Sequence, residues 1–359
     1  MGDRARAFAG RLDGRWSIQI AYRRPGHVAA VTAFSSFLRH ADPRIVYVFD
    51  MALPGVIAGT FAGRGRGPRV IIDTGDAIAA LAKSSGLRGP AGQLATRALE
   101  WYSLRTADRI VVRGRFHQEL LARAGIQATV IPDGVDCTLF RPMDGHALRA
   151  ALGLGTSLVV GLVGSSVWSP KLGIAYGWDL VEMLALVKDI PVRGLLIGDG
   201  SGIEHLRARA RALGVEDRIA FAGRRPLDEL PSLLAACDVC LSTQTNDVVG
   251  QVRTTGKLPL YLACGRYVLA TRVGEAARVL PDEMLLDYEG VVDRSYPERL
   301  AGTVRALDAD RTRLALGNAG PALARQHFDY DMLAGRLEAV LTATLDEDSL
   351  TGSTSGSAR

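Results

Sequence analysis

Short runs of apolar residues, separated by stretches with apolar positions at helical spacing, dominate the first half of the chain. The continuous apolar runs at residues 45–49, 70–72 and 110–112 are typical of strands buried on both faces. Strands that alternate with helices in this way indicate a parallel sheet. Beyond these runs, the pattern predicts strands at 17–22 and 128–131 and helices at 28–39, 94–104 and 116–124.

The second half repeats this plan. It predicts strands at 158–163, 192–197, 218–221, 238–241 and 267–271, and helices at 180–187, 203–212, 227–236, 258–264, 298–307 and 331–345. The pair Ala107-Asp108 before a strand recurs as Cys237-Asp238, which indicates two related halves. The fold class is therefore α/β with two Rossmann-like domains, and the boundary falls near residues 145–154. Because ligands bind beyond the carboxyl ends of parallel strands, we expect the active site between residues 73–76 and 164–171.

Length and charge narrow the possible partners. The 359 residues suit two domains, and the net charge of +5 suits anionic partners such as nucleotide sugars or an acidic membrane surface. Only four of the 43 basic residues are lysines: Lys83, Lys171, Lys188 and Lys257. Against so strong a bias to arginine, a lysine indicates a position that needs an ammonium group. Lys171 and Lys257 fall where we expect phosphate-binding residues. We find no nucleic-acid-binding motif, so nucleic acid is not an expected partner.

The remaining composition indicates a cytoplasmic protein. No apolar run is long enough to span a membrane, and residues 1–14 lack the apolar core of a secretory signal, although peripheral membrane contact stays open. The four cysteines, at positions 137, 237, 240 and 264, form no metal-binding framework, so they are expected to be buried in a reducing compartment, and no metal is expected. Residues 347–359 are small and polar, which is typical of a disordered tail.

The segment Val130-Ile-Pro-Asp-Gly-Val-Asp136, followed by Phe140-Arg-Pro142, joins the two halves. Asp133-Gly134 favours a tight turn. This joint resembles that of retaining glycosyltransferase family four, which usually has Asn at position 133. The resemblance covers residues 40–345 and implies the GT-B fold, in which two Rossmann-like domains face each other across a cleft. It implies an acceptor-side domain at 1–147, a nucleotide-sugar-binding domain at 148–328 and a helix at 329–346 that crosses back to the first domain.

The loop after the strand at 158–163 is a candidate phosphate site. Gly164 and Ser165 lie at the strand end, where free backbone N–H groups can hold a phosphate. In the family that this chain resembles, an Arg in this loop and a Lys further on grip the donor diphosphate. Ser165 takes the position of the Arg, and Lys171 matches the Lys.

The segment from Asn246 to Gly265 is the second candidate for the donor site. The family's Glu-x7-Glu motif would fall on Val252 and Leu260, so both carboxylates are missing. Arg253 and Lys257 instead fit an Arg-x3-Lys version found in the wider group. Four residues apart, they would lie on one side of a helix start, and the intervening Thr254, Thr255 and Gly256 would add hydroxyl and N–H groups. Such a cluster stabilises a leaving diphosphate, although a solvated helix start would look the same.

Further candidates come from strand ends and turns. Asp73 and Asp76 are the candidates for catalytic or acceptor-orienting carboxylates, although Asp76 would equally suit a helix cap. Asp50 and His27 are candidates for the acceptor side. The resemblance implies that the nucleobase lies near Gly223, Arg224 and Arg225, which would otherwise form an exposed basic turn.

These features predict a metal-independent glycosyltransferase that uses a UDP or GDP sugar and needs no prosthetic group. The resemblance implies retention of configuration, with a small-molecule or lipid-linked acceptor from antibiotic biosynthesis or envelope synthesis. The alternative is a repurposed or non-catalytic GT-B protein that binds a nucleotide sugar or couples an atypical substrate, which the missing glutamates favour. A nicotinamide oxidoreductase is disfavoured, because no Gly-x-Gly-x-x-Gly opens a helix after a first strand.

Overall fold

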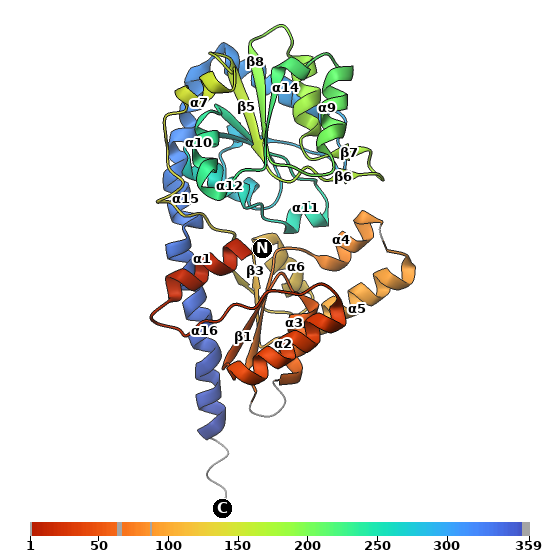
Figure 1. Cartoon of the computed structure of the whole chain (residues 1–359), viewed down its shortest axis with the longest axis vertical. Helices are drawn as coiled ribbons and strands as arrows, with labels where there is room; N and C mark the ends of the chain where they lie inside the picture. The colour runs from red at the N-terminus through yellow and green to blue at the C-terminus, as the bar shows by residue number, and fades with distance from the viewer. Residues whose placement is uncertain (1, 63–66, 87, 354–359) are drawn as a thin grey trace, which may run out of the picture. The chain divides into compact units, whose positions relative to one another are not determined.

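The computed structural model describes residues 2–62, 67–86 and 88–353. The chain divides into two compact units, which are described separately. The first unit contains Met1–Asp133, Val252–Thr254 and the chain from Tyr330 onward, and the second contains Gly134–Gln251 and Thr255–Asp329. Each unit has a parallel sheet covered by helices, which confirms the predicted α/β class with two Rossmann-like domains (Figure 1).

The sheet of the first unit has four parallel strands in the order β1-β2-β3-β4. Alternate residues of β2 face opposite sides, so that Val70 and Ile72 enter one apolar core and Ile71 enters another. The strands are β1 (Ile45–Phe49), β2 (Arg69–Thr74), β3 (Arg109–Val112) and β4 (Thr129–Val130). The three continuous apolar runs thus form strands as predicted.

Helices cover both faces of this sheet. On one face, α3 packs against β1 and β2 and is flanked by α2 and α5 (Figure 1). On the other face, α1 and α16 bring Phe8, Leu12, Leu333 and Leu337 against Ile71. The helices are α1 (Gly2–Leu12), α2 (His27–Ala41), α3 (Leu53–Ala62), α4 (Ile78–Ser85), α5 (Pro90–Thr106), α6 (Arg115–Arg123) and α16 (Tyr330–Ser353).

The strand predicted at residues 17–22 is wrong. This segment has no regular structure, and its side chains Ile18, Ile20 and Tyr22 are 41%, 39% and 58% exposed. Its alternating apolar pattern is that of a strand. The apolar face of the sheet is covered by α1, however, so the side chains of this segment are not needed there and stay exposed. Sequence patterning did not predict α1, in which Phe8 and Leu12 are each 2% exposed.

The sheet of the second unit has six parallel strands in the order β12-β11-β10-β5-β8-β9. A two-stranded antiparallel hairpin, β6 (Trp168–Ser169) and β7 (Ile174–Ala175), follows β5. The sheet strands are β5 (Leu158–Val163), β8 (Val192–Ile197), β9 (Ile219–Gly223), β10 (Val239–Ser242), β11 (Tyr267–Thr271) and β12 (Leu285–Leu286).

One large apolar core lies between this sheet and its helices. The helices are α7 (His146–Ala151), α8 (Trp178–Leu186), α9 (Ile203–Ala212), α10 (Leu230–Ala235), α11 (Val248–Val252), α12 (Lys257–Ala263), α13 (Ala276–Val279), α14 (Tyr296–Ala309) and α15 (Gly320–Phe328). The strands at 158–163, 192–197 and 267–271 and the helix at 203–212 have the bounds that the pattern predicted.

The division between the units differs from the expected domain bounds. The first unit ends at Asp133, because Val135 and Phe140, 1% and 2% exposed, already pack in the core of the second. At the other end, α16 continues to Ser353, into the segment expected to be a disordered tail. Residues 354–359 lie outside the described residues. Within the described part of the chain, no helix has both the length and the apolar character needed to cross a membrane.

Candidate functional site

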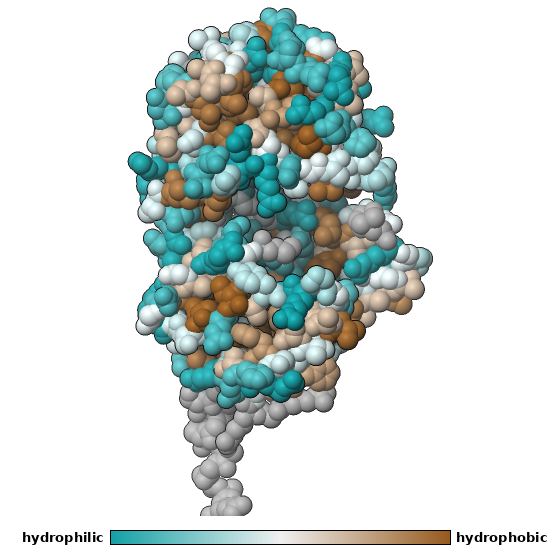
Figure 2. All heavy atoms as spheres, in the orientation of Figure 1, coloured by the Kyte–Doolittle hydropathy of each residue, from teal (hydrophilic) through white to brown (hydrophobic). Residues whose placement is uncertain are grey.

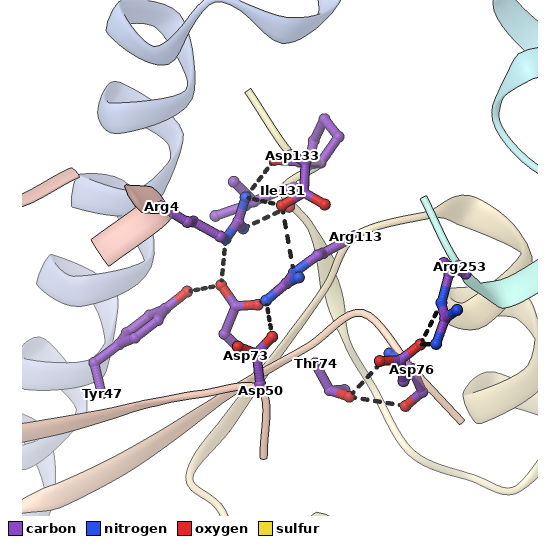
Figure 3. Close-up of polar contacts among 11 residues, drawn as sticks. Arg4, Tyr47, Asp50, Asp73, Thr74, Asp76, Arg113, Ile131, Asp133 and Arg253 are labelled. Carbon is purple, nitrogen blue, oxygen red and sulfur yellow. Dashed lines mark hydrogen bonds and ion pairs between the residues drawn. The ribbon is translucent and has the colours of Figure 1, made fainter. Parts of the chain in front are cut away.

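Charged side chains follow the carboxyl ends of the four strands of the first unit (Figure 3). Asp50 comes after β1, Asp73 belongs to β2, Arg113 comes after β3 and Asp133 follows β4. Because parallel strands end at the same edge of a sheet, these side chains meet there, where open sheets bind ligands. The rule that singled out Asp50 and Asp73 in the sequence therefore also applies to Arg113, which was missed.

Asp73 lies at the centre of this cluster and has no exposed surface. Its carboxylate accepts hydrogen bonds from Arg4 Nε at 2.9 Å, from the Tyr47 hydroxyl at 2.8 Å and from Arg113 Nε at 3.2 Å. A carboxylate with three donors and no open side cannot contact a substrate in this conformation. In this conformation Asp73 therefore holds Arg4, Tyr47 and Arg113, whereas the sequence placed it at a predicted strand end as a candidate catalytic or acceptor-orienting carboxylate.

Arg4 reaches the cluster from α1. Its guanidinium donates to the carbonyl oxygens of Ile131 at 2.8 Å and Pro132 at 2.5 Å, and it lies 3.5 Å from Asp133 Oδ1. Burial works against the charged form, but the carboxylates of Asp73 and Asp133 outweigh it and raise the pKa of Arg4. Arg4 therefore holds α1 to the end of the joint between the halves of the chain.

Asp50 is held in place by its backbone and by Arg113. Asp50 and Met51 both have left-handed backbones, with φ of 54° and 46°, which is unfavourable for residues other than glycine. Arg113 Nη2 pairs with the Asp50 carboxylate, and Met51 N donates to Asp73 O at 3.1 Å. With 22% of its side chain exposed, Asp50 is more accessible to solvent than Asp73.

The cluster has more carboxylates than cations. Asp50, Asp73 and Asp133 share the guanidinium groups of Arg4 and Arg113, with Arg113 Nε 3.6 Å from Asp133 Oδ1. Burial raises the pKa of Asp133, and the two arginines only partly oppose it. The carboxyl ends of these strands therefore form an acidic, tightly bonded edge.

Asp76 is more accessible than Asp73, with 38% of its side chain exposed. Arg253 Nε donates to Asp76 Oδ1 at 2.8 Å, and the Thr74 hydroxyl donates to the Asp76 backbone carbonyl at 2.9 Å. Asp76 does not cap α4. That role belongs to Glu100, which accepts from Ile78 N at 2.6 Å and from Ala79 N at 3.1 Å.

The second unit brings Lys257 to the loop that follows β5. Lys257 Nζ lies 3.6 Å from the ring centroid of Tyr176 and 3.5 Å from where a Cβ on Gly164 would lie. Tyr261 is fully buried, and its hydroxyl oxygen accepts from Val163 N at 2.7 Å. Tyr176 thus contacts the lysine, and Tyr261 binds the end of β5. Neither role was expected from the sequence.

Glycines shape the same loop. A Cβ on Gly198 would lie 1.9 Å from Gly164 O, and one on Gly200 would lie 2.5 Å from Ser166 O. Ser166 N donates to Asp199 O at 2.8 Å. The loops after β5 and β8 thus pack backbone against backbone, which only glycine allows, while Ser165 between them is exposed.

The other sequence candidates of this unit are more scattered. Lys171 is exposed in the turn of the β6–β7 hairpin, and Gly256 is exposed before α12. Thr255 Oγ1 lies 3.4 Å from Ser242 Oγ. On the expected nucleobase side, Arg225 Nε donates to Ala222 O at 2.8 Å, next to the exposed Arg224 and to Gly223, which has a left-handed φ of 71°.

The two remaining candidates, His27 and Thr254, lie in the first unit. His27 is the exposed first residue of α2. Thr254 groups with this unit by its contacts, and its buried hydroxyl has no hydrogen-bond partner among the described residues. In the same described part of the chain, no three His, Cys, Asp or Glu side chains are arranged to hold a metal ion.

Two protein-family models match the chain. Residues 2–134 match the glycosyl transferase 4-like domain, and residues 158–310 match the glycosyl transferases group 1. Curated relatives include two proteins named D-inositol 3-phosphate glycosyltransferase. The one from Segniliparus rotundus is 33% identical over 60% of this chain and 47% of its own length, and the one from Acidothermus cellulolyticus is 30% identical over 62% and 51%. The chain thus spans about half the length of these relatives.

Solved structures show the same fold. The Anabaena protein HepE in complex with UDP matches with a TM-score of 0.68 and 22% identity, covering 88% of this chain and 82% of that one. Sucrose-phosphate synthase from Thermosynechococcus elongatus matches with a TM-score of 0.71 and 19% identity, covering 88% and 77%. At this level of identity the likeness concerns the fold: two Rossmann-like domains.

Proposed function

Because this chain belongs to the glycosyltransferases of the GT-B, family-four type, we propose that it transfers a sugar from a nucleoside diphosphate sugar to a hydroxyl acceptor. HepE, which shares its fold, binds UDP, which supports a UDP sugar as the donor. The relatives named for D-inositol 3-phosphate support a small polar acceptor, although a lipid-linked acceptor fits the same fold.

The observation that carries this proposal is the place of Lys257. Its ammonium group lies at Gly164, where β5 ends, in a sheet whose strand ends are the expected ligand side. A diphosphate leaving group gains negative charge as the glycosidic bond breaks, and a preorganised cation stabilises that charge. We assign diphosphate binding to Gly164, Ser165 and Lys257. We further propose Lys171, Arg253, Thr254, Thr255 and Gly256 for the diphosphate, and Gly223, Arg224 and Arg225 for the nucleobase.

The proposed reaction is metal-independent and retains the configuration. The bond between the anomeric carbon and the diphosphate oxygen breaks, and the electron pair stays on the phosphate beside Lys257. The acceptor oxygen bonds to the same face of the sugar, and its proton passes to the leaving phosphate. Asp50 and Asp76 remain the candidates to orient the acceptor, because their side chains are partly exposed while Asp73 is buried.

Loss of the Glu-x7-Glu carboxylates favours the alternative of a repurposed protein. Val252, at the first glutamate position, is fully buried, and Leu260, at the second, is half-buried. Neither can accept hydrogen bonds from ribose or sugar hydroxyls. A protein that binds the nucleotide but transfers an atypical group is therefore the second candidate. Slow release of diphosphate from UDP- and GDP-sugars would favour the transferase, and its absence across the panel would favour the alternative.

The Lys257→Met variant tests the donor site. We expect it to weaken UDP or GDP binding by about 1.5–3 kcal/mol, which is on the order of 10- to 150-fold, because a charge-assisted contact to the diphosphate is lost. Isothermal titration calorimetry measures the affinity. Lys188→Met removes an exposed lysine of the same unit and serves as the control. Equal nucleotide affinity in the two folded variants would remove the assignment.

A further inference from the structure

Helix α5 exposes several large apolar side chains and buries two hydroxyl side chains, the reverse of the usual pattern. Leu94, Leu99 and Trp101 are 69%, 39% and 59% exposed, whereas Thr96 and Ser103 are 4% and 1% exposed. The two buried hydroxyls donate to carbonyls of their own helix, at 2.7 Å and 2.8 Å. A surface helix normally buries its apolar stripe and exposes its polar one. The exposure of the apolar side chains of α5 to water is therefore unfavourable, which is typical of an interaction surface.

The exposed face of α5 is also cationic. Leu94, Arg97, Trp101 and Arg105 recur at helical spacing on one side, and we refer to them as the α5 stripe. The Arg105 guanidinium lies 5.4 Å from the ring centroid of Trp101. The only acidic residue of α5, Glu100, is turned towards α4, where it binds the backbone N–H groups of Ile78 and Ala79. The stripe therefore combines large apolar groups with positive charge.

A second exposed segment of the same unit has the same character. Tyr22 and Val28 are 58% and 81% exposed, and no Asp or Glu occurs between Asp13 and Asp42, a stretch that contains Arg23 and Arg24. This segment, residues 14–28, includes the first two residues of α2, and α2 packs on α3, as α5 does. Phe61, at the end of α3, is 53% exposed. On the one face that Figure 2 shows, apolar residues are interspersed with polar ones.

We propose that the α5 stripe, together with residues 14–28, binds the surface of an anionic lipid bilayer. Leucine and tryptophan side chains insert at the boundary between headgroups and acyl chains, and arginines extend from the apolar layer to lipid phosphates. A second copy of the chain is a poorer occupant, because two stripes without carboxylates would repel each other. This inference does not depend on sugar transfer, although it fits an acceptor carried on a lipid.

Vesicle co-sedimentation with the full chain tests this surface. We expect binding to vesicles of phosphatidylcholine with phosphatidylglycerol and not to phosphatidylcholine alone, with affinity falling as salt rises. The pair of changes Arg97→Gln and Arg105→Gln should weaken binding about fivefold for each arginine. Leu94→Gln with Trp101→Gln should weaken it further by removing the inserted groups.

Matched changes in the second unit provide the control. Leu227 and Leu316 are 48% and 41% exposed, and their change to Gln should leave vesicle binding unaltered. Equal binding to neutral and anionic vesicles, or equal binding by the stripe and control variants, would overturn the proposal. Concentration-dependent dimers that the stripe changes abolish would assign the face to protein contact instead. The arginine variants alter only exposed side chains, so the test does not depend on the Leu94 and Trp101 variants folding.

Discussion

Buried charges in the first unit are tolerated because each has several partners. Asp73 is fully buried, yet Arg4, Tyr47 and Arg113 all donate to it. Removal of one partner from such a group leaves an uncompensated charge in a medium that solvates it poorly. Through Arg113, which bonds to both carboxylates, the buried Asp73 also helps to hold the more accessible Asp50.

The Arg4→Met variant tests this interpretation. We expect it to lower the free energy of unfolding by about 3–5 kcal/mol, because Asp73 loses a buried cation and the carbonyls of Ile131 and Pro132 lose their donor. Urea denaturation measures the change. Arg6→Met is the matched control, because Arg6 pairs with Asp3 on the surface, where solvent screens the ion pair and its loss changes stability little. Similar small losses in both variants would show that the cluster does not hold α1.

Part of this cluster could be predicted from the sequence. Asp50 and Asp73 follow apolar runs, and the rule that ligands lie at strand ends places them at one edge of the sheet. The same rule applies to Arg113 after β3. Arg4 could not be found in this way, because it lies 69 residues from Asp73 on a helix that only tertiary packing reveals. The support of Lys257 by Tyr176 likewise depends on a side-chain contact that spacing does not encode.

At the level of elements, the strands were the most predictable part. A continuous apolar run such as that of β5 has few alternatives, because a strand buried on both faces needs apolar residues at every position. The segment at 17–22 shows the limit of this reasoning. Its alternation matches a strand, but whether a strand forms depends on a partner with free backbone groups, and that depends on the whole unit.

The loops at the ends of β5 and β8 depend on glycine. We expect Gly198→Ala to destabilise the protein by more than about 2 kcal/mol and to weaken nucleotide binding, because its Cβ would overlap Gly164 O. Gly153→Ala is the control, since Gly153 has a left-handed φ of 62° and no heavy atom within 4 Å of an added Cβ. It should cost only about 1 kcal/mol and leave nucleotide affinity unchanged. Thermal unfolding with and without UDP measures both effects, and equal loss in the two variants would contradict the role of the close packing.

On the scale of the whole molecule, the two units have separate apolar cores. The sequence predicted two domains and a helix that returns to the first, and α16 does group with the first unit. The sequence could not locate the end of that unit. Tertiary packing decides which of the two apolar cores takes up Val135 and Phe140, and sequence patterning does not show it. The chain therefore changes units at the Asp133-Gly134 turn, before the boundary expected near residues 145–154.

Separate cores should give separable unfolding. We expect Leu337→Ala to lower the free energy of unfolding of the first unit by about 2–4 kcal/mol, because Leu337 is 3% exposed in its core. Only the melting temperature of that unit should fall. Bound UDP should raise only the transition of the second unit. Differential scanning calorimetry resolves the two transitions, with Leu316→Ala, 41% exposed, as the control for the truncation. A single transition that moves under both changes would show that the units unfold together.

The return of α16 has a consequence during translation. Residues 134–329 are synthesised before α16, so Ile71, Val111 and Ile131 have only the cover that α1 supplies until this helix leaves the ribosome. At about 5–20 residues per second, that interval lasts roughly 10–40 s. The unit whose synthesis begins first is thus completed last, and we expect chaperones to bind its partly covered apolar face in the meantime.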